Sequence, residues 1–145
     1  ITGYQWLWQY EYLNTDVSFY SKLSTPYNEI YNKDTKNVNY LQEVDKELIL
    51  PINKKIRFLL TSNDVLHAWW VPDLALKKDA IPGYINEMSV VINEPGTYRG
   101  RCAELCGRHH GFMPIVIKAV EEKEYIEWLA NANKAKTADV AEINK

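Results

Sequence analysis

The chain has 145 residues, of which 46% are hydrophobic and 25% charged, a composition typical of a globular domain rather than a disordered or collagen-like chain. Its 17 basic and 19 acidic residues leave a net charge of −2, which argues against a nucleic-acid partner. We find no apolar run long enough to span a membrane and no signal peptide. Because the chain starts at Ile1 without Met, we expect a mature or trimmed part of a longer protein.

Short strands are predicted along most of the chain. Aromatic residues alternate with other residues from Tyr4 to Tyr12, which predicts one strand with an aromatic face. Residues 14–40 are polar and rich in Tyr and Asn, and we interpret them as a loop or weak strand. Apolar patterning predicts further strands within residues 48–51, 56–62, 65–71, 84–92, 98–102 and 115–117.

The C-terminal part has a different pattern. Residues 121–130 have helical spacing and an acidic first turn, whereas residues 134–145 are rich in Ala, Lys and Asp and are expected to fray. Short strands bounded by Gly, Pro and Asn turns predict an all-β fold, a Greek-key β-sandwich or barrel with a short C-terminal helix. We assign the domain to residues 1–130 and a polar tail to residues 131–145.

Five potential metal ligands gather within twelve residues: Cys102, Cys106, His109, His110 and Met113. Thiolate, imidazole and thioether groups are soft ligands that suit copper. The one His outside this segment is His67. A distant His with a Cys, His and Met loop is the ligand pattern of a cupredoxin, whose blue-copper site needs a single Cys. The second Cys would let two sulfurs bridge two metal ions.

Each of these residues also has a plainer interpretation. Taken alone, Cys102 and Cys106 could be buried core thiols or a local disulfide, and His67 and Met113 could be core residues. A zinc site with two Cys and two His is chemically possible, but the Cys spacing and the Met fit it less well. The joint spacing of the residues favours a metal site over separate packing roles.

Further motifs are distributed over nearly the whole chain. They are the aromatic segment 3–12, Leu50-Pro51, the segment 60–67, the run 78–83, Pro95-Gly96-Thr97-Tyr98 and Cys102-x-Glu104-x-Cys106-x₃-His110-x₂-Met113-Pro114. Together they resemble the CuA (binuclear copper) domain of cytochrome c oxidase subunit II, which has a cupredoxin-like fold. The Trp pair at positions 69 and 70 resembles bacterial members of that family.

The resemblance implies a ligand set. Cys102 and Cys106 would bridge two copper ions, His67 and Met113 would complete one of them, and His110 and the backbone carbonyl of Glu104 would complete the other. The carboxylate of Glu104 would reach a magnesium ion at the interface with oxidase subunit I. His109 matches no ligand position.

The resemblance also implies a route and a location. Trp6 would receive electrons from cytochrome c, although spacing alone favours a buried strand residue, and Asp64 is the best-matched carboxylate for docking that partner. Electrons would pass to the haem centres of subunit I for oxygen reduction in a proton-translocating terminal oxidase. The domain would lie on the periplasmic side of the inner membrane, anchored through N-terminal helices that precede this sequence.

Three other functions share part of this pattern. The CuA domain of nitrous oxide reductase has a similar loop, but it usually carries Trp where this chain has Glu104, and it lacks the run 79–83. A copper chaperone with a C-x₃-C motif needs a βαβ pattern, which we do not find. A quinol oxidase subunit II has the same fold but lacks the copper ligands.

Overall fold

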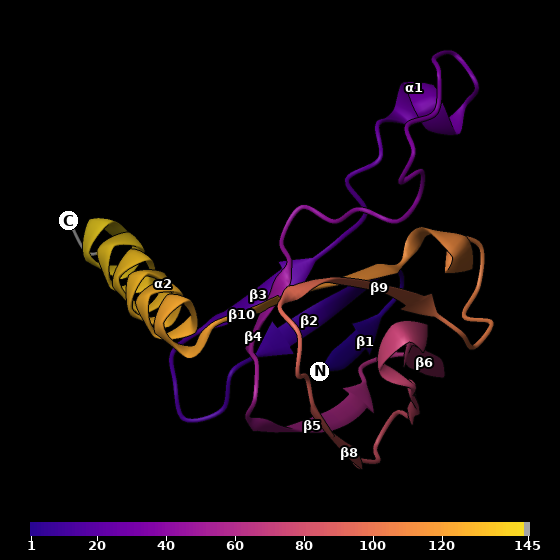
Figure 1. The fold of residues 1–145 in the computed structure, drawn as a ribbon. Helices are drawn as coiled ribbons and strands as arrows, with labels where there is room; N and C mark the ends of the chain where they lie inside the picture. The colour runs from indigo at the N-terminus through magenta and orange to yellow at the C-terminus, as the bar shows by residue number, and fades with distance from the viewer. Residues whose placement is uncertain (144–145) are drawn as a thin grey trace.

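Two five-stranded β-sheets form the body of the protein in this computed structural model (Figure 1). The structure describes the backbone of residues 1–143 and the side chains of residues 1–132. In order across the first sheet lie β3 (Ser18–Ser21), β2 (Leu7–Glu11), β1 (Thr2–Tyr4), β5 (Lys55–Ser62) and β8 (Asn86–Val91). Across the second sheet lie β4 (Leu48–Pro51), β10 (Pro114–Val120), β9 (Gly96–Cys102), β6 (His67–Val71) and β7 (Leu76–Ala80). The predicted all-β sandwich is confirmed.

Strands that are neighbours in space are often distant in sequence. Strand β1 pairs in parallel with β5, and β4 pairs in parallel with β10, whereas the other neighbouring strands are antiparallel. The connections therefore cross between the sheets, as in a Greek-key sandwich. This two-sheet architecture differs from the βαβ fold that a copper chaperone of the kind considered above would need.

Aromatic side chains join the two sheets. Trp69 of β6 packs on Phe58 of β5 with ring centroids 5.3 Å apart, and its indole N–H donates to the Tyr10 hydroxyl of β2 at 3.2 Å. Both partners come from the first sheet, so this contact closes the core between the sheets. A buried indole N–H usually requires such a partner, because leaving it unpaired would cost free energy.

The N-terminal aromatic segment is two strands rather than one. Strands β1 and β2 pair antiparallel, with Tyr4 opposite Leu7, and Gln5 and Trp6 form the turn between them. The prediction of a single strand over Tyr4–Tyr12 is therefore wrong. Buried and more exposed side chains alternate within β2, where Trp8 is buried. A turn of two residues keeps the alternation of aromatic residues in step, so the sequence pattern does not reveal the turn.

Residues 14–40 contain strand β3 and then an arm that extends from the sandwich (Figure 1). The arm carries the single-turn helix α1 (Tyr27–Ile30), and the exposed rings of Tyr27 and Tyr31 stack on each other with centroids 6.3 Å apart. The interpretation of this segment as a loop or weak strand describes it well, apart from the short helix.

The predicted C-terminal helix is present as α2 (Glu122–Ile143) and continues beyond residue 130. Tyr12 anchors its first turns, with its ring 5.1 Å from that of Trp128. The boundary at residue 130 between domain and tail stays a prediction, and residues 144–145 lie outside the described part of the chain. Among the described residues, no helix is both long enough and apolar enough to cross a membrane.

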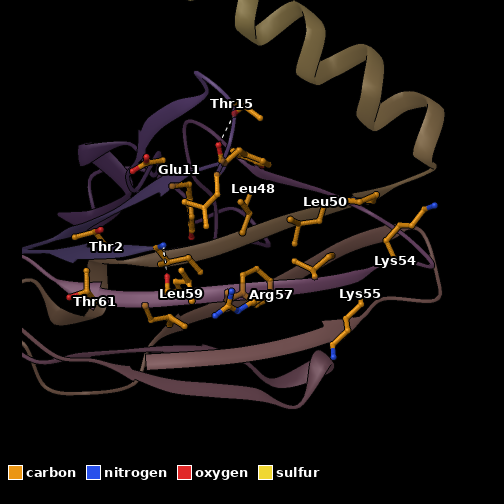
Figure 2. Close-up of a pocket in the computed structure, with 18 of the residues that line it drawn as sticks. Thr2, Glu11, Thr15, Leu48, Leu50, Lys54, Lys55, Arg57, Leu59 and Thr61 are labelled. Atoms are coloured by element: carbon orange, nitrogen blue, oxygen red, sulfur yellow. Dashed lines mark hydrogen bonds between the residues drawn. The ribbon is translucent and has the colours of Figure 1, made fainter. Parts of the chain in front are cut away.

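A cavity of about 430 Å³ opens between β4 and β5 (Figure 2). Its lining includes Leu48 and Leu50 from β4 and Phe58 and Leu60 from β5, with Lys55 and Arg57 also contributing. None of the residues predicted to bind metal lines this cavity. The cavity is therefore separate from the candidate metal ligands.

Gly100 permits close pairing of β6 and β9, which carry candidate ligands. A Cβ atom at position 100 would collide with the backbone carbonyl of Trp70, which cannot move without breaking the sheet. We expect Gly100→Ala to lower the free energy of unfolding by about 3 kcal/mol, the upper range for overpacking. Urea denaturation measures this change.

Gly111→Ala is the matched control, because a Cβ there would meet nothing within 4 Å. We expect that variant to stay within about 0.5 kcal/mol of the parent, as for most surface substitutions. Equal stability of the two variants would contradict the steric role of Gly100.

Candidate metal centre

The predicted metal ligands converge at one end of the second sheet. His67 is the first residue of β6, Cys102 is the last residue of β9, and Met113 immediately precedes β10. Strands β6 and β9 are neighbours, with Trp69 opposite Cys102 in the register. The sheet therefore brings His67, which is 35 residues away in the sequence, next to the Cys-containing loop.

The loop between β9 and β10 is closed by backbone hydrogen bonds. The Cys102 N–H donates to the Met113 carbonyl at 3.1 Å, and the Ala103 N–H donates to the Ala68 carbonyl of β6 at 2.9 Å. Within the loop lies the short 3₁₀ helix η2 (His110–Phe112). Both ends of the loop are therefore fixed to strands of the second sheet.

Four side-chain sulfur and nitrogen atoms meet inside this loop. The sulfurs of Cys102 and Cys106 lie 3.9 Å apart, and both cysteines are buried and free. The Met113 sulfur lies 3.5 Å from that of Cys106, and the His110 Nδ1 lies 3.3 Å from the same sulfur. The interpretation of the two cysteines as a disulfide is therefore not supported, and the sulfurs lie together as a pair of free thiols.

The two imidazoles flank different sulfurs. Nδ1 of His67 lies 3.8 Å from the Cys102 sulfur, whereas Nδ1 of His110 lies beside Cys106. The ligand atoms of His67, Cys102 and Cys106 all lie within 4.8 Å of one another, a spacing that could hold a metal ion, and His110 falls outside this group. The arrangement thus has two sulfurs at its centre with one imidazole on each side.

His67 is fixed from three directions. Its Nε2 lies 2.9 Å from a carboxylate oxygen of Asp64, which leaves Nδ1 directed toward Cys102. Trp8 packs edge-on against the imidazole, with centroids 5.8 Å apart. Gly3 lies on another side, where a Cβ would come within 2.7 Å of the imidazole Cδ2. These contacts set the ring orientation, which is the usual task of groups behind a metal-binding His.

Asp64 is therefore held by hydrogen bonds to the protein, although the residue is exposed to solvent. Its carboxylate also accepts a hydrogen bond from the Gln5 backbone N–H at 2.7 Å. Burial opposes ionisation of Asp64, but its hydrogen bonds with His67, Gln5 and Val65 outweigh burial and lower the pKa of the carboxyl. The docking role that the resemblance assigns to Asp64 stays a prediction, and the structure adds a second role in holding His67.

The two thiols differ in acidity. Burial and then the neighbouring Cys102 raise the pKa of the Cys106 thiol to about 12. For Cys102, burial is outweighed by hydrogen bonds, first of all from His67, so its pKa is lowered. Burial likewise opposes protonation of His67, but its hydrogen bonds with Cys102 and Asp64 raise its pKa. One thiol is thus more readily ionised than the other, and a cation bound between them would favour loss of both protons.

Trp6 is partly exposed in the turn between β1 and β2, and the interpretation of Trp6 as a buried strand residue is wrong. Its indole N–H donates to the backbone carbonyl of Cys106 at 3.1 Å, and the Gln5 side-chain amide donates to the same carbonyl at 2.8 Å. The turn is therefore connected directly to the Cys-containing loop. Gln5 gave no signal in the sequence, because its partner lies 101 residues away.

Glu104 presents two different groups to its surroundings. Its backbone carbonyl lies 3.3 Å from the Cys102 sulfur, on the inner side of the loop. Its side chain is exposed to solvent, so the carboxylate is available to a partner rather than to the thiols. The roles that the resemblance implies for the carbonyl and the carboxylate stay predictions.

Comparisons with known proteins lead to one protein family. The sequence model for the periplasmic domain of cytochrome c oxidase subunit II matches residues 1–120. The chain belongs to the cytochrome c oxidase subunit II family. It is 43% identical to cytochrome c oxidase subunit 2 of the insect Oncopeltus fasciatus over 129 residues, which are 89% of this chain and 55% of the relative. The identity to the same subunit of the dragonfly Sympetrum striolatum is 42% over 133 residues, 92% of this chain and 56% of the relative.

A solved bacterial structure has the same fold. The periplasmic domain of cytochrome oxidase subunit II from Bradyrhizobium japonicum superimposes with a TM-score of 0.81 and 38% identity. The superposition covers 92% of this chain and 91% of that domain. The subunit II periplasmic domain described here spans about half the length of the curated relatives it matches.

Proposed function

We propose that this subunit II domain holds a binuclear copper centre that takes single electrons from cytochrome c and passes them to the haem centres of oxidase subunit I. The observation that carries this proposal is the pair of buried thiol sulfurs, 3.9 Å apart, with His67 beside one and His110 beside the other. A single tetrahedral zinc ion would draw both imidazoles to one point. The observed arrangement instead suits two ions that share the sulfurs.

The donor set fits copper in its chemistry. Cys102 and Cys106 would bridge the two ions, His67 and Met113 would complete one, and His110 and the Glu104 carbonyl would complete the other. Thiolate, imidazole and thioether donors together favour copper over hard cations such as magnesium. Bound there, copper would supply a one-electron redox couple shared between two ions.

The protein contributes rigidity and exclusion of water. His67, Cys102, Cys106 and Met113 are all at most 3% exposed, so solvent has little access to the donor atoms of these four residues. The loop ends are hydrogen-bonded to strands, and the His67 ring is held by Asp64 and Trp8. A site that changes little between oxidation states has a small reorganisation cost, which favours fast electron transfer.

Two faces of the site would serve different partners. Trp6, partly exposed and hydrogen-bonded to the Cys106 carbonyl, offers a route from docked cytochrome c to the thiols. The exposed Glu104 carboxylate would bind magnesium at the contact with subunit I. The whole protein would act as part of a proton-translocating terminal oxidase at the inner membrane, with this domain on the periplasmic side and N-terminal helices as the anchor.

Metal analysis tests the proposal. Copper-loaded protein should contain two coppers per chain, show intense purple thiolate-to-copper absorption, and give an electron paramagnetic resonance signal of one spin shared by two coppers. A blue single-copper spectrum, or tight binding of one zinc ion in place of copper, would overturn the binuclear assignment. Reduction by cytochrome c in stopped-flow mixing then tests the electron donor.

The Asp64 carboxylate should contribute to copper affinity although it is not a ligand. Asp64→Asn weakens the partner that directs Nδ1 of His67 toward Cys102. Loss of such a supporting hydrogen bond typically weakens metal binding about 10- to 100-fold. Competition with a copper chelator measures the change.

Asp73→Asn provides the control, because it removes an equal charge from an exposed position in the 3₁₀ helix η1 (Pro72–Leu74). Its copper affinity should equal that of the parent. Equal affinities for all three proteins would show that Asp64 does not orient the His67 ligand.

A further inference from the structure

His109 contacts Trp6, the residue that we propose receives electrons from cytochrome c. Its ring meets that of Trp6 nearly edge to face, with centroids 4.7 Å apart and an interplanar angle of 79°. The His109 ring also stacks on Phe112, with centroids 5.4 Å apart and an angle of 27°. Three rings from two separate segments therefore form one continuous aromatic contact at the surface of the Cys-containing loop.

The hydrogen bond of Trp6 does not by itself fix its ring. The indole N–H to the Cys106 carbonyl secures one edge, and rotation about that bond would still tilt the ring plane. Gly107 approaches the ring on one side, where a Cβ would lie 3.2 Å from the indole Cζ2. His109 supplies an aromatic side-chain contact that opposes tilting, and edge-to-face contact is a preferred geometry for aromatic pairs.

The position of His109 is itself determined by the loop. The Phe112 N–H donates to the His109 carbonyl at 2.8 Å, so the backbone of His109 is attached to the 3₁₀ helix η2 that contains His110. A side chain held this way moves with the ligand loop. Through His109, the loop that carries Cys106 and His110 therefore also orients Trp6.

We propose that His109 is a positioning residue that holds the Trp6 indole in the orientation that couples it to the Cys106 carbonyl. This inference rests on the proposed function for its consequence, electron transfer, but the contact itself exists without metal. His109 acts through its flat ring rather than as a metal ligand. A ring of similar shape should therefore replace it, whereas a small side chain should not.

Nuclear magnetic resonance of the metal-free protein tests the contact directly. The chain has five Trp residues and hence five indole N–H signals, of which the Trp6 signal is assigned by its loss in Trp6→Phe. His109→Ala should shift the Trp6 indole signal and speed its hydrogen exchange, and His109→Phe should restore slow exchange. An unchanged Trp6 signal in His109→Ala would overturn the inference whatever the metal content.

Copper-loaded protein tests the consequence. At saturating cytochrome c, His109→Ala should lower the electron-transfer rate about fivefold, and His109→Phe should recover most of it. Copper content and reduction potential should equal those of the parent, which a mere loss of loop structure would not allow. Tyr27→Ala, which removes an exposed ring of the arm, is the control and should keep the parent rate.

The outcomes separate the two proposals. A parent protein that binds two coppers and accepts electrons, together with a His109→Ala variant at the parent rate, would overturn the role of His109 and leave the proposed function intact. A parent that binds no copper pair would overturn the proposed function. The indole signals would still decide whether His109 holds Trp6.

Discussion

Cys106→Ser should abolish the shared-spin signal of the copper-loaded protein and reduce its copper content from two ions per chain to one or none. The Cys106 sulfur faces Cys102, His110 and Met113 at 3.9, 3.3 and 3.5 Å. A hydroxyl is a much poorer soft ligand than a thiolate, so no bridge can form through position 106. Metal analysis and electron paramagnetic resonance measure both effects.

Cys102→Ser is the matched variant, because it removes the other sulfur with an equally conservative change. It should lose the shared-spin signal as well. Both variants should unfold cooperatively without metal, since a serine nearly preserves the volume of the buried side chain. A variant that retained one spin delocalised over two coppers would refute a bridging role for the altered cysteine.

Trp6→Phe should lower the rate of electron transfer from bound cytochrome c by about tenfold or more, equivalent to about 1.4 kcal/mol of barrier. Phenylalanine has no N–H to donate to the Cys106 carbonyl, so the direct hydrogen bond from the ring at position 6 to the Cys-containing loop is lost. Copper binding should persist, because Trp6 contributes no donor atom to the sulfur cluster. Stopped-flow mixing with reduced cytochrome c over a range of concentrations separates the transfer rate from the affinity.

Trp128→Phe is the control for this experiment. Trp128 is also partly exposed, but it lies in helix α2 and packs on Tyr12, away from the Cys-containing loop. Its replacement should leave the rate unchanged. If Trp6→Phe also transferred electrons at the parent rate, Trp6 would be a packing residue and electrons would arrive by another route.

A salt series extends the same measurement to docking. With a net charge of −2, the chain offers little long-range attraction to a basic partner, so local carboxylates must provide it. Exposed charges act mainly on the association rate and are screened over about 10 Å at 0.1 M salt. The transfer rate at saturation should therefore depend less on salt than the association rate does.

Local pattern was sufficient for the fold class and for choosing the residues of the candidate metal centre, whose roles stay predictions. Alternating apolar residues and turn residues predict strands because each side chain in a strand responds to the face on which it lies. Cys102, Cys106, His110 and Met113 lie within one loop, so their short spacing already brings them together. His67 could be proposed because few other soft ligands exist in the chain.

Contacts between residues that are distant in sequence determined the orientation of the side chains around the candidate metal centre. Trp6 lies in a turn, because β1 and β2 pair with each other, and it reaches the Cys106 carbonyl 100 residues away. The Asp64 carboxylate orients His67, whose ring fits against Gly3 because that residue has no side chain. The sequence does not reveal the contact between the rings of His109 and Trp6. Such contacts form between segments that are brought together by the whole sandwich. The sequence alone therefore determines which donor atoms are present, and the tertiary structure decides how they are aimed.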